Sequence, residues 1–217
     1  MEKMLVTQAL DERDLLEKKI NDKINKAKFV DIIKVNEERT VNSKLTREEF
    51  EAEAKSEYQQ IKDLIDRFSR LEAAIVLSNA TTKIQTSRGE MTVAAAITLR
   101  NRLKGKGYST SANFEGHLEA ALELAYKQNV MAANGKNSEV QNTAETMRLS
   151  ILGKDTKVKD DKPLAVVDAY VKENTTELAD PLDAKKTFET MKEQMSALTT
   201  ELDTQIKVSN ATTFIEF

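Results

Sequence analysis

Apolar residues recur along most of the chain at the alternating three- and four-residue spacing of helices that pack in pairs. One such seam lies in the second quarter of the chain, at Ile61, Leu64, Phe68, Leu71 and Ile75. Another lies near the end, at Phe188, Met191, Met195, Leu198, Leu202 and Ile206. Because this spacing is typical of coiled-coil packing, it predicts a mainly all-α fold of long helical hairpins that form a bundle.

The first part of the chain is predicted to form two helices joined by an irregular connector. The first helix spans about Lys3–Lys28, and the second runs to about Leu77. Thr46 and Glu49 have the spacing of a capping box, which marks the start of the second helix. Between the helices, Phe29–Val35 is rich in β-branched residues, so a short strand is expected there.

The second part is predicted to begin with a helix over about Met91–Lys104, opened by a capping box of Ser87 and Glu90. Two further helices are expected at Phe114–Ala133 and Ser138–Leu152. The Asn-Gly pair between them and Gly153 after them are typical helix breakers.

The end of the chain is predicted to hold a second strand-like connector and a long final helix. Leu164–Val171 resembles the first connector in its content of β-branched residues. The final helix is expected to start with Asp180 as N-cap and Pro181 at the first helical position, where a missing amide costs nothing. The two connectors are the candidates for strand pairing, either with each other or with another chain.

Comparison of the sequence with itself indicates an internal duplication. Leu71–Ile84 and Leu202–Ile215 align without a gap and share eight of fourteen residues, including an identical Ser-Asn-Ala-Thr-Thr. A weaker match relates Met4–Leu16 to Met91–Leu103, with Met, Val, Ala, Arg and Leu in common. Since both matches occur in the same order, duplication explains them better than chance.

The two halves are predicted to differ in length. The matches are displaced by 131 residues (71 to 202) and by 87 residues (4 to 91), so the second half has 44 more between its matched ends. Five of the six glycines fall within 105–163, which places the inserted helices there. The expected repeats are residues 1–86 and 87–217, both within one bundle.

Composition excludes several classes of function. The net charge is −3, and both signs are interspersed, so no surface for nucleic acid is expected. The chain has no cysteine, which excludes disulfides and thiolate chemistry. No apolar run exceeds five residues and no signal peptide opens the sequence, so we expect a cytoplasmic chain without a membrane span.

No catalytic or metal-binding pattern is present, and we expect no enzyme activity, no cofactor and no metal site. His117 is the one histidine, and it lacks the His or Cys partners of a transition-metal site. Gly105-Lys106-Gly107 lacks the spacing of a phosphate-binding loop.

The repeated Ser-Asn-Ala-Thr-Thr segments are the first candidates for a special role. Asn79 and Asn210 are expected to terminate helices in the left-handed conformation, and Thr82 and Thr213 to lead into extended chain. The simpler interpretation is a structural corner that occurs twice. The alternative is that pseudo-twofold symmetry brings the corners together as a shared polar site for a ligand or partner.

Two equivalent arginines, Arg13 and Arg100, are the second candidates, since both lie on or beside an apolar stripe. A buried guanidinium requires hydrogen-bonded partners. The candidates at the matching ends of the other helices are Asn79, Asn210, Glu72 and Asp203. We expect a structural clamp, meaning a polar link between two helices, rather than a catalytic group.

The sequence resembles a bacterial family of small helical proteins known as septicolysin-like. The resemblance rests on Gln8–Ile20, Asn79–Thr82 and Glu201–Thr213 and covers about half of the chain, whereas Gly105–Pro163 departs from the family. The family name implies a pore-forming activity and no catalytic residues.

Together these features favour a non-enzymatic structural or interaction protein. We expect a homo-oligomer or a complex with other protein subunits, as in a virion or injection machine if a phage encodes the chain. The alternative is a membrane-active, septicolysin-like protein that acts through amphipathic helices such as Phe114–Ala133.

Overall fold

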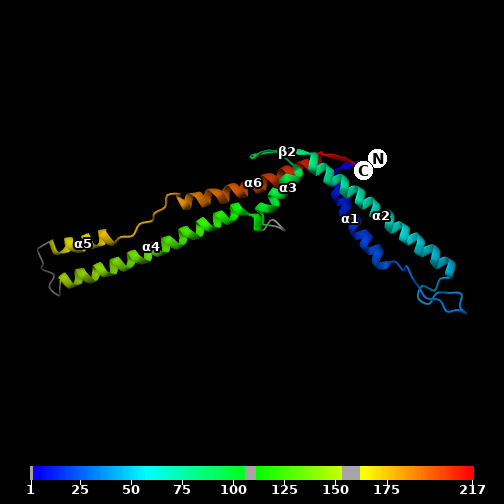
Figure 1. The fold of residues 1–217 in the computed structure, drawn as a ribbon, viewed down its shortest axis with the longest axis horizontal. Coiled ribbons are helices and arrows are strands. Elements are labelled where there is room, and N and C mark those ends of the chain that lie inside the picture. Colours follow the sequence, from blue (N-terminus) through cyan, green and yellow to red (C-terminus); the bar gives the residue numbers. More distant parts are fainter. Residues whose placement is uncertain (1, 106–110, 153–161) are drawn as a thin grey trace. The chain divides into compact units, whose positions relative to one another are not determined.

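A computed structural model describes residues 2–105, 111–152 and 162–217, and these residues are mainly helical (Figure 1). Their helices are α1 (Val6–Lys26), α2 (Arg47–Thr81), α3 (Val93–Leu103), α4 (Phe114–Leu152), α5 (Lys162–Asn174) and α6 (Ala184–Thr212). Four short strands accompany them: β1 (Lys3–Leu5), β2 (Lys83–Thr86), β3 (Gly89–Thr92) and β4 (Phe214–Glu216).

The chain divides into two compact units. The first consists of Met1–Asn101 and Leu198–Phe217, and the second consists of Arg102–Ala197. Both α3 and α6 run from one unit into the other. The predicted repeats 1–86 and 87–217 concern sequence similarity and remain a prediction.

The first unit contains a hairpin of α1 and α2 that packs along most of the length of α1. Its core joins Val6, Ala9 and Leu16 of α1 to Leu71 and Ile75 of α2, and Ile215 of β4 closes the end. Thus the predicted seam is confirmed for its buried members, and Leu64 and Phe68 flank them. Burial of these apolar side chains is the main favourable term for a two-helix layer.

The second unit contains a hairpin in which α4 packs against α5. Val167 of α5 and Ala144 of α4 are fully buried there. Further along α4, the ring of Tyr126 meets the ring of Phe188 of α6, with centroids 6.0 Å apart.

The expected break at Asn134-Gly135 is wrong, because α4 is a single helix of 39 residues. A glycine inside a helix costs only about 1 kcal/mol, and packing along one face exceeds that cost. Close to this glycine, the side chain of Asn137 forms two hydrogen bonds with the backbone of Thr176, in the segment between α5 and α6. These bonds add a tertiary contact at this point of α4.

The strand-like connectors were also predicted incorrectly. Leu164–Val171 lies inside helix α5, where β-branched residues pack against α4. Phe29–Val35 forms no strand, and only Ile33 makes an isolated antiparallel bridge, to Thr40. The two connectors therefore do not pair with each other, and local propensity was overridden by helix packing in one case and by loop hydrogen bonds in the other.

Three capping patterns were predicted at helix starts, and one of them is confirmed. Thr46 accepts a hydrogen bond from the Glu49 amide, and Glu49 accepts one from the Thr46 amide. The Ser87–Glu90 box is wrong because both residues belong to the β2–β3 hairpin.

The last helix starts later than expected. It begins at Ala184, after Asp183 with a φ of 47°, so Pro181 is not its first residue. Asp180 nevertheless accepts a hydrogen bond from the Ala184 amide at 2.8 Å.

Candidate functional site

The candidate site consists of two corners, each built from a two-stranded ribbon and the helices that enter and leave it. Both lie in the first unit. In one corner β2 pairs with β3, and in the other β4 pairs with β1; both pairs are antiparallel. In the centre of the ribbons, Ile84 lies opposite Met91, and Ile215 lies opposite Met4.

These ribbons have the same register with respect to the repeated sequence. The two isoleucines are equivalent positions of the longer sequence match, and the two methionines are equivalent positions of the shorter one. The flanking pairs correspond as well, since Lys83–Thr92 matches Phe214–Leu5, and Gln85–Glu90 matches Glu216–Lys3.

The repeated Ser-Asn-Ala-Thr-Thr segment makes the same backbone hydrogen bonds in both corners. The Thr82 amide donates to the Ser78 carbonyl at 2.8 Å, and the Thr213 amide donates to the Ser209 carbonyl at 2.9 Å. These bonds satisfy carbonyl groups in the last turn of α2 and α6.

The first threonine of each Thr-Thr pair also satisfies the end of its helix. The hydroxyl of Thr81 donates to the Leu77 carbonyl, and that of Thr212 donates to the Val208 carbonyl, both at 2.9 Å. A hydroxyl that bonds back to the preceding turn is a common use of threonine in helices.

The second threonine connects the incoming helix to the outgoing one. Its carbonyl accepts the first amide of the next helix: Val93 donates to Thr82, and Val6 donates to Thr213, both at 2.9 Å. One unsatisfied amide of a helix N-terminus is thereby satisfied in each corner.

Burial follows the same equivalence. Six equivalent pairs are each exposed by no more than 9%: Val6 and Val93, Ala9 and Ala96, Leu71 and Leu202, Ile75 and Ile206, Ser78 and Ser209, and Ile215 and Ile84. The strand that follows α6 packs on the α1–α2 hairpin through Ile215. The corner that ends one half therefore completes the core of the other.

The side chains of Asn79 and Asn210 make no hydrogen bond among the described residues. Both are half-buried, and both lie inside the last helical turn, since the helices continue to Thr81 and Thr212. Neither adopts the left-handed conformation that was expected of a helix-ending asparagine.

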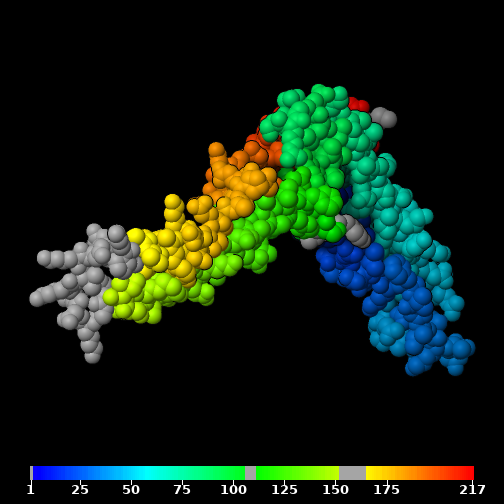
Figure 2. All heavy atoms as spheres, turned by 60° about the vertical axis from the view of Figure 1, so that its left-hand side comes forward, coloured from blue at the N-terminus to red at the C-terminus, as the bar shows by residue number. Residues whose placement is uncertain are grey.

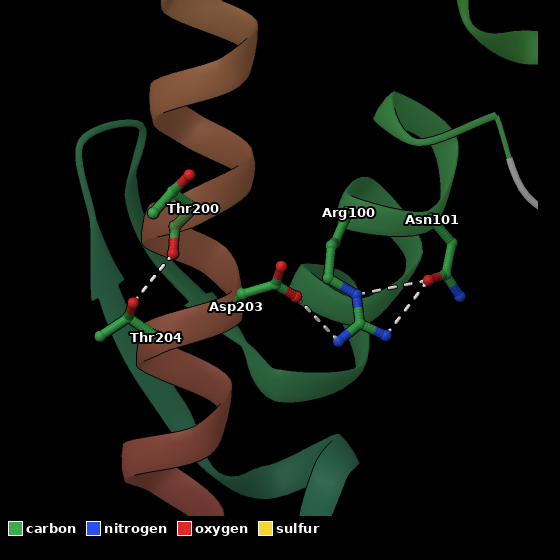
Figure 3. Close-up of polar contacts among 5 residues, drawn as sticks. All are labelled: Arg100, Asn101, Thr200, Asp203 and Thr204. Atoms are coloured by element: carbon green, nitrogen blue, oxygen red, sulfur yellow. Dashed lines mark hydrogen bonds and ion pairs between the residues drawn. The ribbon is translucent and has the colours of Figure 1, made fainter.

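Arg100 makes a polar link between α3 and α6 (Figure 3). Its Nη1 lies 3.4 Å from Oδ1 of Asp203, one of its four predicted partners, and its Nε and Nη2 bond to Asn101. In the same turn of α6, the Thr204 hydroxyl donates to the Thr200 carbonyl. Because both ion-pair side chains are about a quarter to a third exposed, the pair links helices without forming a closed site.

Arg13 does not form the equivalent link. Its guanidinium bonds to the neighbouring Asp14 at 2.8 Å rather than to Glu72, which is equivalent to Asp203. The structure thus brings Arg100 to a predicted partner and leaves Arg13 on the surface of α1.

Arg67 of α2, which the sequence did not single out, makes the helix-to-helix link in this corner. It bonds to Glu12 of α1 and to Glu2, and it lies over the ring of Phe217. The hydrogen bonds that Arg67 donates to Glu12 and Glu2 raise the pKa of its guanidinium, and the bond to Glu2 lowers the pKa of that carboxyl group. Residues so distant in sequence give no local signal.

Glu201 of α6 was also not predicted. Its carboxylate accepts from both the backbone amide and the hydroxyl of Ser87, at 2.8 and 2.6 Å. The β2–β3 turn is thereby tied to α6, and the serine assigned to a helix cap instead binds a distant carboxylate.

The polar groups of the corners do not converge on a reacting centre. Among the described residues, no group of three or more His, Asp or Glu side chains is placed to hold a metal ion. None of the helices described is both long and apolar enough to cross a membrane. Comparison with protein-family models, curated proteins and solved structures finds no match.

Proposed function

We propose that the chain is a non-enzymatic structural and interaction protein, a cytoplasmic or virion subunit that assembles with further copies of itself or with other subunits. In this proposal the corners are an internal duplication and serve as fixed joints. The loop between α1 and α2 presents a contact surface.

The observation that carries the proposal is an apolar patch on the loop between α1 and α2. Val30, Ile32 and Val35, here called the tip patch, are exposed by 86%, 63% and 101%. Exposed apolar residues that cluster in one short loop, unlike isolated ones, indicate a candidate interaction site.

The loop that carries the tip patch is internally organised. The Asp31 carboxylate accepts hydrogen bonds from the Ile32, Asn42 and Ser43 amides and from the side chain of Asn42. Burial raises the pKa of Asp31, but the hydrogen bonds from Ser43, Ile32 and Asn42 outweigh it and hold the pKa well below its usual range. These bonds hold the apolar residues outward in a defined loop, which supports a contact role.

Sedimentation equilibrium of the whole chain tests this proposal. The expected result is a mass that is a multiple of 24.4 kDa and that falls when the tip patch is changed by Val30→Ser, Ile32→Ser and Val35→Ser together. Leu15→Ser with Leu77→Ser, which also alters exposed apolar residues, is the matched control and should leave the mass unchanged. A wild-type chain that stays monomeric at all concentrations contradicts self-assembly through the tip patch.

A membrane-active role is the second candidate. It is supported by the exposure of Phe114, Leu118, Leu124 and Met131 on α4, within the segment expected to be amphipathic. Dye-loaded vesicles distinguish the two candidates: release of dye favours membrane activity, and intact vesicles together with an oligomeric mass favour the structural role.

A further inference from the structure

The second unit contains a groove between α4 and the connection from α5 to α6. It has a volume of about 450 Å³, within the range of small-molecule sites. In Figure 2 the yellow and orange atoms of this part of the chain lie along the yellow-green atoms of α4. The groove lies wholly within the second unit.

The connection that forms one wall of the groove is fixed at both ends. At its start, the Asn137 side chain accepts from the Thr176 amide at 2.7 Å and donates to the Thr176 carbonyl at 2.9 Å. At its end, Asp180 accepts from the Ala184 amide, and the Thr187 hydroxyl donates to the Leu182 carbonyl. The groove is therefore preformed, which lowers the entropic cost of binding.

The groove exists because the α4 residues that face the α5–α6 connection have small side chains. Ala125, Ala132 and Ala133 line the groove on the helix side, and Leu178 and Leu182 line it on the other. The ring of Tyr126, braced by Phe188, stands at one end. These walls suit an apolar or aromatic body.

The charged lining favours a cation. Glu177 and Asp180 contribute two carboxylates, whereas Lys136 contributes one ammonium group. Within the described part of the chain, no hydrogen bond or ion pair engages the Glu177 carboxylate or the Lys136 ammonium group. A carboxylate without a partner at the edge of an apolar groove can hold an amine through an ion pair.

We propose that this groove binds a small amphipathic amine. Its apolar body lies on the alanines between Leu178 and Leu182, and its ammonium group is held by Glu177. This ligand site is independent of the proposed assembly role, since the tip patch belongs to the other unit.

A matched pair of probes tests the ligand class. Phenethylammonium and 3-phenylpropionate have similar apolar bodies and opposite charges, and their affinity for the full-length protein is measured by calorimetric titration. Phenethylammonium should bind about tenfold more tightly, a modest difference because the charges are partly exposed. Equal affinity, tighter binding of the carboxylate, or no binding of either probe overturns the proposal.

Substitutions locate the site. Ala132→Phe fills the groove from an exposed helix position and should abolish binding of phenethylammonium, whereas Ala120→Phe, an exposed α4 position that does not line the groove, is the matched control. Glu177→Gln should weaken binding severalfold, and Lys136→Gln should strengthen it. Unchanged binding in Ala132→Phe, with helix content intact by circular dichroism, shows that the amine binds elsewhere and refutes the site.

Discussion

The backbone amide of Val93 donates a hydrogen bond to the carbonyl of Thr82 at 2.9 Å, and the same bond, of the same length, joins Val6 to Thr213. In each case the donor is the first residue of a helix, α3 or α1. The acceptor is the residue directly after another helix, α2 or α6. Because the four residues occupy equivalent positions in the two sequence matches, the chain uses one local solution twice.

Equivalent core positions should have equivalent energetic weight. Leu71 and Leu202 are both fully buried, so Leu71→Ala and Leu202→Ala should each lower the free energy of unfolding by about 2–5 kcal/mol. Urea unfolding monitored by circular dichroism measures this. Leu77→Ala and Val208→Ala, at equivalent exposed positions, are the controls and should change stability by less than about 0.5 kcal/mol. A large effect at only one of the two leucines would show that the corners are not equivalent.

A circular permutation tests whether the β1–β4 ribbon can be joined covalently and the β2–β3 ribbon opened without loss of the fold. The Glu2 amide donates to the Phe217 carbonyl and the Phe217 amide to the Glu2 carbonyl, both at 3.2 Å. A short Gly-Ser linker between residues 217 and 1, with the chain opened between Ser87 and Arg88, should therefore preserve helix content and cooperative unfolding. A permutant opened between Leu71 and Glu72 interrupts α2 and should not fold.

Loss of the hydrogen bonds between Glu201 and Ser87 should affect the structure only around the β2–β3 turn. Glu201→Ala removes the acceptor of two hydrogen bonds from Ser87 and should lower the free energy of unfolding by about 1–2 kcal/mol. Glu193→Ala, an exposed acidic position on the same helix, controls for loss of charge. Chemical-shift changes confined to residues around Ser87 support the assignment, whereas no change at Ser87 contradicts it.

The loop organised by Asp31 should respond to acid. Its folded pKa lies below the ordinary value of 3.8, so the loop is stabilised above that value and loses this contribution as the pH falls toward the folded pKa. Amide resonances of Asn42 and Ser43 should remain protected at neutral pH, and their protection should decrease progressively as the pH falls below about 4. In Asp31→Asn the protection should be weak at every pH; retention of full protection in that variant would show that the carboxylate is not required.

Much of the fold was predictable because helix seams depend on residues close in sequence. The positions Leu71, Ile75, Leu202 and Ile206 were recognised from spacing alone and are buried. By contrast, β-branched residues in Leu164–Val171 suggested a strand, and packing against α4 makes the segment helical. Propensity decides such short segments only when no tertiary surface competes.

The candidate site was predictable only in part. Comparison of the sequence with itself identified the corners at Thr82 and Thr213. The position of Asp203 near the end of its helix predicted it as one possible partner of Arg100, and the two are in contact. Arg67 and Glu201 could not be found in this way, because their partners lie in distant segments. Equivalence also failed to predict that Arg13 bonds to Asp14, since exposed ion pairs contribute little energy and do not determine which carboxylate an arginine contacts.

Hydrogen exchange at the two corners tests the central claim most directly, that one corner is built twice and supports both halves. The amides of Val93 and Thr82 make the hydrogen bonds of one corner, and the amides of Val6 and Thr213 make the equivalent bonds of the other, so each corner provides one set. If the corners are equivalent joints, both sets should be strongly protected in the native protein, and Leu71→Ala and Leu202→Ala should each reduce protection in both corners. Fast exchange of one set while the other remains protected would contradict the account.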